Sequence, residues 1–481
     1  MLAKFKQLGK ESLIYGVAGM LNKFIAFFLV PLYTHVFTQE QYGLQGLVVT
    51  VITLAGTLAV MGMDSAAHNW YWQTEIEADR RVTIASWFWC QLLFSLLLGA
   101  VIFLSSGMLS VLLTGDASAA PLLRLGAFTL PLNVCHGVVT NYFRLKRRAK
   151  ATMCYSVVTN LMLVGMTILF ILVLDQGLAG FFIAQIVSGV ITTIAGAFIL
   201  RGVIGPRHAH SRRFREMLPY ALPLVPAAFA FWALGFADRL FVEKLVSTEQ
   251  VAVYQLAATL ASGVAMISGA FTMAWGPFAY SLQRQPDAPA LYGRMLPVYL
   301  AVGGIFVGCL AMFSREAVQI MAPESYSAAA PVAALLSLGV LANGLSYIAG
   351  TGLALARSSS PITAAVTIAA AVNLLLNILL IPAHGITGAA WAAVFSWTVY
   401  TGFIFWRAQK IHPIPYQYRR AVLLAVILTL TVCVAPRIVI PGAAVGILSK
   451  SLLFCFFVMI VLTIAVPGWT RILRGKAMKR F

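Results

Sequence analysis

Apolar runs of about twenty residues recur along the whole chain, separated by short segments that carry most of the charges. A helix needs about 20 residues to cross the roughly 30 Å hydrocarbon core of a bilayer. Membrane β-strands would instead show about ten residues of alternating character, a pattern that we do not find. The sequence therefore predicts an all-α integral membrane protein with fourteen transmembrane helices: Ser12–Tyr33, Gly43–Met63, Val82–Leu104, Pro121–Phe143, Ala151–Val173, Leu178–Leu200, Met217–Ala237, Val251–Ala274, Leu291–Phe313, Ala328–Leu355, Pro361–Ile381, Ile386–Trp406, Ala421–Val439 and Val445–Val466.

The placement of lysine and arginine gives these helices a direction, because cytoplasmic loops carry an excess of both residues. With the N-terminus in the cytoplasm, the inner segments hold 27 of the 34 basic residues, the outer segments hold six, and Lys23 lies inside a span. This asymmetry predicts cytoplasmic N- and C-termini. Removing two helices together would preserve it, so twelve spans remain open as an alternative count.

Two pairs of sequence segments resemble each other, and both pairs have nearly the same separation along the chain. "FTQEQYGLQGL" and "VSTEQVAVYQL" lie 209 residues apart, and "GLAGFFIAQ" and "GITGAAWAA" lie 208 residues apart. Transporters often carry such repeats, with the substrate path between them. The matches predict two homologous six-helix lobes that give alternating access by rocking. The expected parts are an N-lobe (1–200), a cytoplasmic basic linker (201–216), a C-lobe (217–407), and two further helices with a basic cytoplasmic tail (408–481).

Composition then excludes several classes of protein. The 481 residues are 60% hydrophobic and 10% charged, whereas a soluble domain carries about 25% charge. The net charge of +19 lies in short clusters between spans, which membrane topology explains better than nucleic-acid binding. The six cysteines include no CxxC pair and no cysteine–histidine pair at metal spacing. Nucleotide loops and nucleophile elbows are missing too, so we expect no metal, no catalytic residue and no enzymatic activity.

Lys23 is the most informative residue of the first span. It lies about ten residues, or roughly 15 Å, from either end, so its side chain cannot reach water from a lipid-facing position. A lysine left in lipid costs at least about 3 kcal/mol. We expect Lys23 and its neighbour Asn22 to form a cationic site for an anionic substrate, with a buried pair between helices as the alternative. Asp238 and Arg239, in the equivalent helix seven, form either a local ion pair or a counterpart of this site.

Other polar residues in or beside the spans suggest contacts with sugars. Asn373 and Asn377 stand four apart on one helical face, where they either hold helices together or recognise sugar hydroxyls. Asp64, His68 and Trp275 lie at the predicted cytoplasmic ends of spans two and eight, among aromatics that suit an interfacial belt or stacking on a sugar. Every acidic residue of the first lobe is expected at a helix end or in a loop. This distribution favours an anionic cargo over cationic drugs.

Several motifs together carry a resemblance to a known family. "FTQEQYGLQGL", "GMDSAAHNWYW", "FADRLFVEKL", "AWGPFAYS" and "GITGAAWAA" resemble the polysaccharide-transporter branch of the multidrug/oligosaccharidyl-lipid/polysaccharide (MOP) exporter superfamily, the Wzx-type O-antigen and exopolysaccharide flippases. The resemblance runs from about Lys10 to Trp406. It implies MATE-like V-shaped bundles around a cationic lumen. It also implies that Lys23 is the basic residue such proteins carry in helix one.

Two further positions can be compared with the family pattern. Asp238 and Arg239 match a frequent Asp-Arg pair of helix seven. After "GMDSAA" a basic residue is expected, and His68-Asn69 stand there instead. A phosphate site at this end of helix two is therefore less well supported by the motif.

The resemblance implies a multi-pass protein of the bacterial inner membrane that flips undecaprenyl-pyrophosphate-linked oligosaccharides for surface polysaccharide synthesis. Its expected partners are this lipid-linked substrate, membrane lipids, a polysaccharide polymerase and glycosyltransferases, with no nucleic acid. No cofactor is expected, and coupling to an H⁺ or Na⁺ gradient stays open. The alternatives are a lipid II flippase, a MATE-like drug/cation antiporter, a membrane polymerase or ligase, and a scaffold. The short outer loops argue against the polymerase and the ligase.

Overall fold

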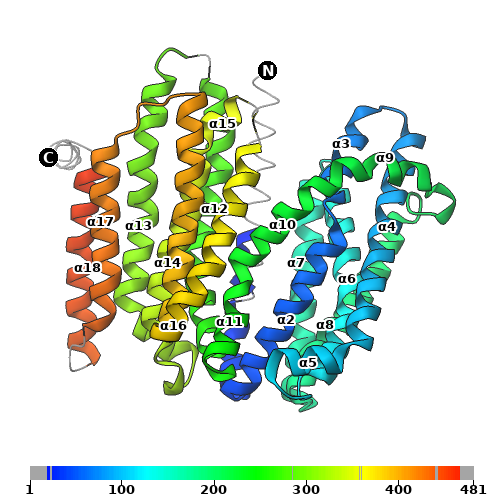
Figure 1. The fold of residues 1–481 in the computed structure, drawn as a ribbon, viewed down its shortest axis with the longest axis horizontal. Coiled ribbons are helices and arrows are strands. Elements are labelled where there is room, and N and C mark those ends of the chain that lie inside the picture. The colour runs from blue at the N-terminus through cyan, green and yellow to red at the C-terminus, as the bar shows by residue number, and fades with distance from the viewer. Residues whose placement is uncertain are drawn as a thin grey trace, which may run out of the picture. The chain divides into compact units, whose positions relative to one another are not determined.

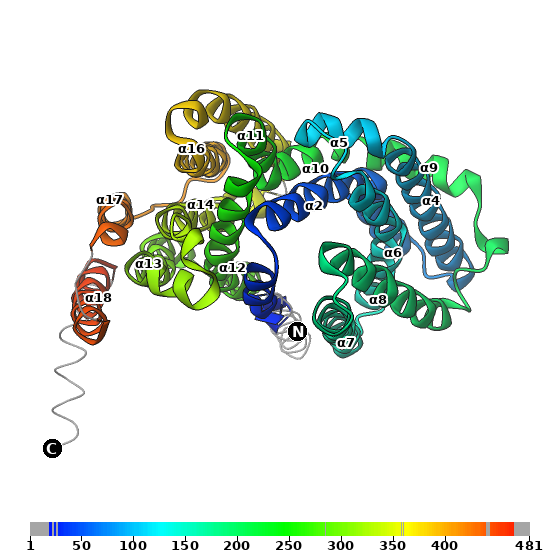
Figure 2. The ribbon, with the colours of Figure 1, turned by 90° about the horizontal axis from the view of Figure 1, so that it is seen from below.

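The computed structural model describes residues 19–21, 24–25, 27–283, 285–356, 358, 360–438 and 443–465. Over these residues the chain is almost entirely helical and contains no strand, as the sequence predicts. The helices, drawn in Figures 1 and 2, divide into two compact units. The N-terminal unit ends at Ala252 and the C-terminal unit begins at Val253.

The N-terminal unit is a helical bundle in which α6 packs against α2, α4 and α8, and α7 packs against α8. Long apolar segments form helices because each backbone polar group must be satisfied within its own segment in hydrocarbon. The helices are Phe27–Val36, α2 (Gln39–Val60), α3 (Met63–Gln73), α4 (Glu77–Leu104), α5 (Ser106–Thr114), α6 (Ala120–Leu145), α7 (Ala149–Ile168) with a π turn (Leu169–Val173), α8 (Gly177–Leu200), α9 (Ser211–Ala221), α10 (Val225–Trp232) with a π turn (Ala233–Ala237), and α11 (Asp238–Leu245).

A break separates α2 from α3. Met61 and Gly62 both have positive φ, at 49° and 67°. A Cβ at Gly62 would lie 2.6 Å from the carbonyl oxygen of Ala221, so the close approach of α9 requires glycine here. The break redirects the chain, and α3 then packs against both α4 and α9.

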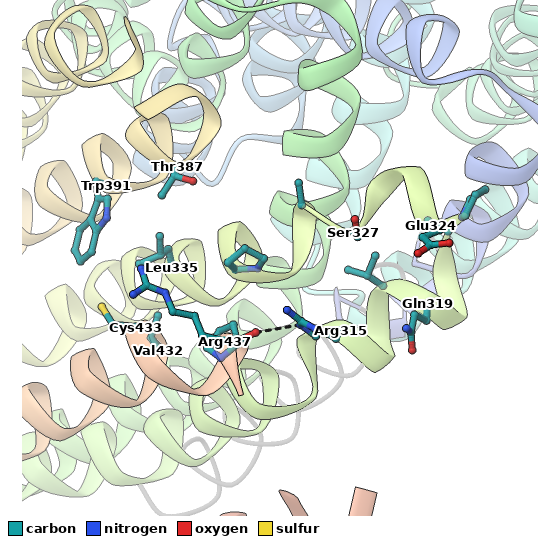
Figure 3. Close-up of a pocket in the computed structure, with 16 residues that line it drawn as sticks. Arg315, Gln319, Glu324, Ser327, Leu335, Thr387, Trp391, Val432, Cys433 and Arg437 are labelled. Carbon is teal, nitrogen blue, oxygen red and sulfur yellow. Dashed lines mark hydrogen bonds between the residues drawn. The ribbon is translucent and has the colours of Figure 1, made fainter. Parts of the chain in front are cut away.

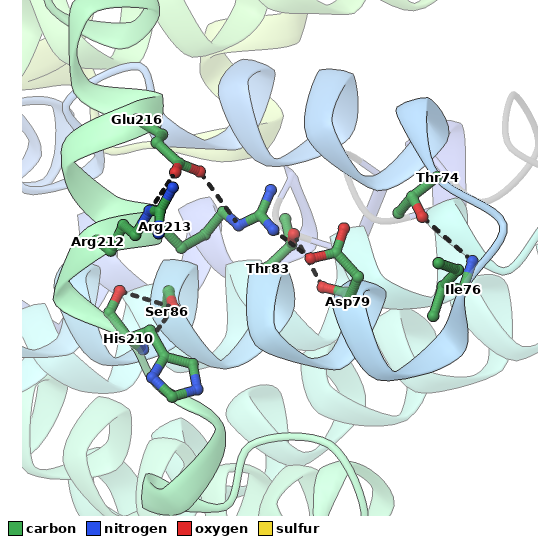
Figure 4. A network of polar contacts seen from close by, with 9 residues as sticks. All are labelled: Thr74, Ile76, Asp79, Thr83, Ser86, His210, Arg212, Arg213 and Glu216. Atoms are coloured by element: carbon green, nitrogen blue, oxygen red, sulfur yellow. Dashed lines mark hydrogen bonds and ion pairs between the residues drawn. The ribbon is translucent and has the colours of Figure 1, made fainter.

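The linker predicted at 201–216 is docked on α4. His210 N donates to Ser86 Oγ (2.9 Å), and Ser86 Oγ donates back to the His210 carbonyl (3.3 Å). The Arg213 guanidinium forms an ion pair with Asp79 at the start of α4 (Figure 4). These contacts fix the chain between α8 and α9, and α10 and α11 pack against α2 of the same unit. The four-part organisation inferred from the repeat stays a prediction.

The C-terminal unit is built around α13 and α14. α14 packs between α13 and α16, while α17 and α18 lie against α13 (Figure 2). An ion pair between Lys450 Nζ and Glu316 Oε1 (2.6 Å) fastens α18 to α13. The helices are α12 (Thr248–Leu282), which begins in the N-terminal unit, α13 (Ala288–Met321), α14 (Ala329–Ala349), α15 (Thr351–Leu355), α16 (Ser360–Ile411), α17 (Tyr418–Val434) with a 3-10 turn (Ala435–Arg437), and α18 (Ala443–Ala465).

The described residues contain twelve helices long and apolar enough to cross a membrane. One of them, α16, has 52 residues and breaks at Gly385, whose φ is 56° and ψ is −139°. A Cβ at Gly388 would collide with the carbonyl of Leu380, so the chain folds back at this break and α16 accommodates two predicted spans. The first predicted span, Ser12–Tyr33, falls largely outside the described residues. The count of fourteen is therefore not confirmed.

The glycine match at offset 208 has a structural counterpart. Gly177 and Gly385 both adopt positive φ, at 53° and 56°. A Cβ at Gly180, or at its equivalent Gly388, would lie too close to a backbone carbonyl of the preceding helix. The same tight turn thus occurs once in each predicted lobe.

The match at offset 209 also has a structural counterpart. Gln41 N donates to Thr38 Oγ1 (3.2 Å) at the start of α2, and Gln250 N donates to Ser247 Oγ (3.4 Å) at the start of α12. Both are N-cap hydrogen bonds, which satisfy an otherwise orphan backbone donor. Two equivalent turns and two equivalent caps support the internal repeat.

The turn at Gly385 gives a stability prediction. Its φ and ψ lie in a region that side chains rarely adopt, so Gly385→Ala is expected to cost about 1–3 kcal/mol of unfolding free energy. The matched control is Gly402→Ala in the same α16, where no atom lies within 4 Å of the new Cβ and where alanine should gain about 0.5–1 kcal/mol. Unfolding midpoints in detergent micelles measure both. Equal midpoints for the two variants would contradict the strained turn.

Candidate functional site

The best-organised polar site of the N-terminal unit surrounds Asp64 in the first turn of α3. Trp87 Nε1 (3.0 Å) and Gln91 Nε2 (2.8 Å), one turn apart on α4, donate to Asp64 Oδ1. Asn141 Nδ2 of α6 donates to Oδ2 (2.9 Å). Gln91 Nε2 also donates to the Val60 carbonyl (3.1 Å). Side chains of α4 and α6 therefore both donate to one half-buried carboxylate on α3.

The two donors on α4 are more deeply buried than the carboxylate they hold. Trp87 is 0% exposed and Gln91 is 1% exposed. The Asp64 carboxylate lines a cavity of about 360 Å³, together with Thr53, Thr57 and Gln91. Hydrogen bonds thus hold the Asp64 carboxylate in place, and the residue also faces the cavity.

A second cavity with a polar lining shares one residue with the cavity at Asp64. Asn133 of α6 lines the cavity beside Asp64 and also a second cavity of about 180 Å³. His136, Asn160, Gln185, Ser188 and Thr192 line that second cavity. Polar residues within membrane helices are expensive and commonly mark functional paths. Polar side chains of α6, α7 and α8 thus gather around the second cavity, within helices that are apolar over most of their length.

The arrangement around Asp64 suits a proton or a monovalent cation. A carboxylate has about four lone-pair positions, and three of them receive the N–H groups described above. Hydroxyl oxygens of Thr53 and Thr57 line the same cavity, although each hydroxyl donates its hydrogen to a backbone carbonyl of α2. In the described residues no cluster of three or more His, Cys, Asp or Glu side chains could hold a metal ion. The chemistry is therefore that of a single carboxylate with neutral oxygen neighbours.

His68 stands one turn after Asp64 on α3. Its Nε2 is buried and has no hydrogen-bond partner among the described residues. The sequence predicts Asp64 and His68 together at a cytoplasmic mouth. The structure places both on α3, and the mouth itself stays a prediction. The sequence counted Asp64 as a helix-end residue, whereas the structure surrounds it with donors from α4 and α6.

Trp275, predicted at the same mouth, lies on α12 in the C-terminal unit. Its Nε1 donates to Thr351 Oγ1 (3.0 Å), and its ring stacks on Phe271 at 6.0 Å between centroids. The side chain is 5% exposed. In this structure the indole is a packing element and presents no open face to a sugar.

Asn373 and Asn377 share one face of α16, as the sequence predicts. Asn377 Nδ2 donates to Asn373 Oδ1 (3.0 Å), and both side chains are fully buried. Asn373 Nδ2 has no hydrogen-bond partner in the part of the chain that the structure describes. In this structure the pair lies within the helix packing and out of reach of a sugar.

The cationic residues predicted for the substrate fall into two groups. Asp238 and Arg239 begin α11; Asp238 is buried, and the Arg239 guanidinium lies 5.1 Å from the ring centroid of Phe236 and donates to the Gly235 carbonyl (3.3 Å). Lys23 and Asn22 lie outside the described residues. Their assignment to a substrate site stays a prediction.

Sequence reasoning missed the residues that hold Asp64. Trp87 and Gln91 lie at i and i+4 within an apolar span, which is the spacing for two side chains on one helical face. A glutamine inside such a span was a usable signal, because an amide in hydrocarbon needs a partner. The partner itself lies 27 residues earlier in the chain, and no local pattern identifies it.

The fold matches solved membrane transporters over nearly the whole chain. The lipid II flippase MurJ, in an inward closed conformation, superposes with a TM-score of 0.70 over 94% of this chain and 98% of that chain, at 13% identity. An inward-facing MATE multidrug transporter of the MOP superfamily superposes with a TM-score of 0.62. The match covers 86% of this chain and 95% of that chain, at 15% identity. A mutant of VcmN, a MATE transporter from Vibrio cholerae, superposes with a TM-score of 0.58. The match covers 85% of this chain and 98% of that chain, at 14% identity.

The protein is therefore a multi-pass membrane protein whose fold is similar to that of MurJ and of the MATE transporters. Residues 8–283, more than half of the chain, match the family model described as "Polysaccharide biosynthesis protein". The chain belongs to this polysaccharide biosynthesis family, as the resemblance of its motifs indicates. Among curated protein sequences none matches it significantly.

Proposed function

We propose that this protein is a flippase that moves undecaprenyl-pyrophosphate-linked oligosaccharides across the bacterial inner membrane, for synthesis of a surface polysaccharide. The observation that carries the proposal is the family match over residues 8–283 on a chain with the fold of a lipid-linked-sugar flippase. A pyrophosphate cannot cross bare hydrocarbon, because burying its charges without partners costs far more than a protein cavity that replaces its hydration. Lys23 is the proposed phosphate contact, and the sugars follow through a wet path.

We further propose that the cycle is driven by a proton or sodium ion bound at Asp64. The carboxylate faces a cavity, and buried donors hold it in place. Ion binding there would neutralise a charge inside the bundle and change the free-energy difference between the two access states. A driving ion can shift that equilibrium only by its differential affinity for the two states.

The alternative cargo is lipid II. The MurJ likeness favours it, since the superposition covers 94% of this chain, while the family match favours polysaccharide precursors. A drug antiporter is supported by the MATE likeness alone.

A reconstituted flipping assay tests the proposal. Proteoliposomes would carry this protein and a lipid-linked oligosaccharide labelled on its sugar, with a membrane-impermeant reagent reporting the exposed leaflet. We expect label movement with an undecaprenyl-pyrophosphate oligosaccharide, and at least about tenfold slower movement with lipid II, a preference worth about 1.4 kcal/mol. Movement of lipid II alone would reassign the cargo. Liposomes in which neither lipid moves under any ion gradient would contradict the flippase assignment.

A further inference from the structure

The C-terminal unit contains a cavity of its own, which shares no lining residue with the cavity at Asp64. Its volume is about 730 Å³, within the range of small-molecule sites. Side chains of α13, α14, α16 and α17 with its 3-10 turn line it, and Figure 3 shows them around one space. The apolar floor includes Leu335 and Val432.

Two arginines give the cavity its charge. Arg315, near the end of α13, and Arg437, in the 3-10 turn after α17, are both exposed and both line the space. Arg315 Nε donates to the Pro436 carbonyl (3.1 Å), which ties the two segments together and fixes Arg437 beside Arg315 in the wall. The neighbouring carboxylate of Glu316 is paired with Lys450 at 2.6 Å. That pairing leaves the Arg315 charge available to a ligand.

The remaining lining suits a carbohydrate. Trp391 of α16 lines the cavity and stacks one ring face on Phe395, at 5.5 Å between centroids. Gln319, Ser327 and Thr387 add amide and hydroxyl groups, and Glu324 adds one carboxylate. An indole beside hydroxyls, amides and a carboxylate matches the apolar face and the hydroxyl edge of a sugar ring. Glu324 would repel a doubly charged phosphate, whereas it can accept the hydroxyl hydrogens of a singly charged sugar.

We propose that this cavity, which we name the Arg315–Arg437 pocket, binds an acidic saccharide, with its carboxylate on the two guanidiniums and one ring against Trp391. Arginine forms bidentate hydrogen bonds with carboxylates, which gives both affinity and orientation. The inference deepens the proposed function, since it assigns the cargo an acidic sugar, and it rests on that function only for the source of the saccharide. The same oxyanion-and-hydroxyl chemistry occurs in anionic lipid headgroups, so the test must separate the two sources.

The test is a calorimetric titration of the full-length protein in phosphatidylcholine nanodiscs. The probes are a disaccharide with one glucuronic acid and the neutral glucose disaccharide of the same linkage. We expect the acidic probe to bind at least about tenfold more tightly than the neutral one, and Arg437→Gln to remove that preference. Trp391→Ala should weaken the binding of both probes. The matched control is Arg294→Gln, an exposed arginine on the same α13, roughly 30 Å from Arg315, which should bind both probes as wild type does.

Two further measurements keep the test decisive. Raising NaCl from 50 to 500 mM should weaken binding of the acidic probe to the wild-type protein several-fold. This measurement uses no variant, so it does not depend on whether a variant folds. Replacing part of the phosphatidylcholine with phosphatidylglycerol should leave the affinity for the acidic probe unchanged when both membranes are compared at 500 mM NaCl, which screens the negative surface charge. Loss of saccharide binding in phosphatidylglycerol would make the pocket a lipid site and overturn the proposal. Equal binding of the two probes, binding of neither, or full acidic preference in Arg437→Gln would overturn it as well.

The titration tests the pocket and the flipping assay tests the flippase assignment, so either proposal can be contradicted without the other. Binding of the acidic probe in a protein that moves no lipid-linked sugar would overturn the flippase and leave the pocket standing. Flipping by a protein that binds neither probe would overturn the pocket alone.

Discussion

Replacing Asp64 with asparagine is expected to remove the ion dependence of transport and to slow the ion-driven rate by about 10- to 100-fold. The estimate follows from the about 1.5–3 kcal/mol that a hydrogen bond or contact to a charged group contributes. Asparagine keeps the size of the side chain but carries no negative charge to offer a proton or a sodium ion. The measurement is the flipping rate in proteoliposomes under imposed H⁺ and Na⁺ gradients, separately.

Asp64→Glu and Glu40→Gln are the controls for this variant. Glutamate keeps the charge, although its longer side chain disturbs the hydrogen bonds from Trp87 and Gln91, so we expect a reduced rate that still responds to the gradient. Glu40 is exposed in the first turn of α2, and its replacement by glutamine should leave the rate unchanged. An Asp64→Asn protein that still responds to an ion gradient would refute the coupling role, because a structural role alone would lower the rate without removing the response.

The fold could be predicted from the sequence to a large extent. Apolar runs give the helices because lipid permits few other structures, and the offset of 208–209 identified two equivalent turns and two equivalent caps. The division at Ala252 was not predicted, because α9 is held by contacts that no hydropathy pattern encodes. The Arg213–Asp79 pair, for example, joins residues 134 positions apart.

The candidate site was less predictable than the fold. Asp64 was singled out as a polar residue at the end of a span, and His68 with it. Their surroundings depend on which faces of α4 and α6 turn toward α3, and that is decided by packing over the whole bundle. The reverse holds for Trp275 and Asn373: their residue types suggest sugar contacts, yet both are buried. Residue type and span position cannot distinguish a polar group in the packing from one that lines a cavity.

Replacing Lys23 with alanine is expected to reduce flipping by roughly 100-fold or more, since an ammonium contact to a pyrophosphate contributes about 1.5–3 kcal/mol and more where water is excluded. The reason is the sequence position: Lys23 lies near the middle of a predicted span, where a lysine with no partner would be costly. Lys23→Arg keeps the charge and should retain part of the activity. Lys244→Ala is the matched control, because Lys244 is exposed at the end of α11 and its loss should leave flipping unchanged. The assay uses equal amounts of membrane-inserted protein, so that insertion and transport are separated. A Lys23→Ala protein that flips its lipid-linked sugar at the wild-type rate would exclude this lysine from the substrate path and return it to a helix-packing role.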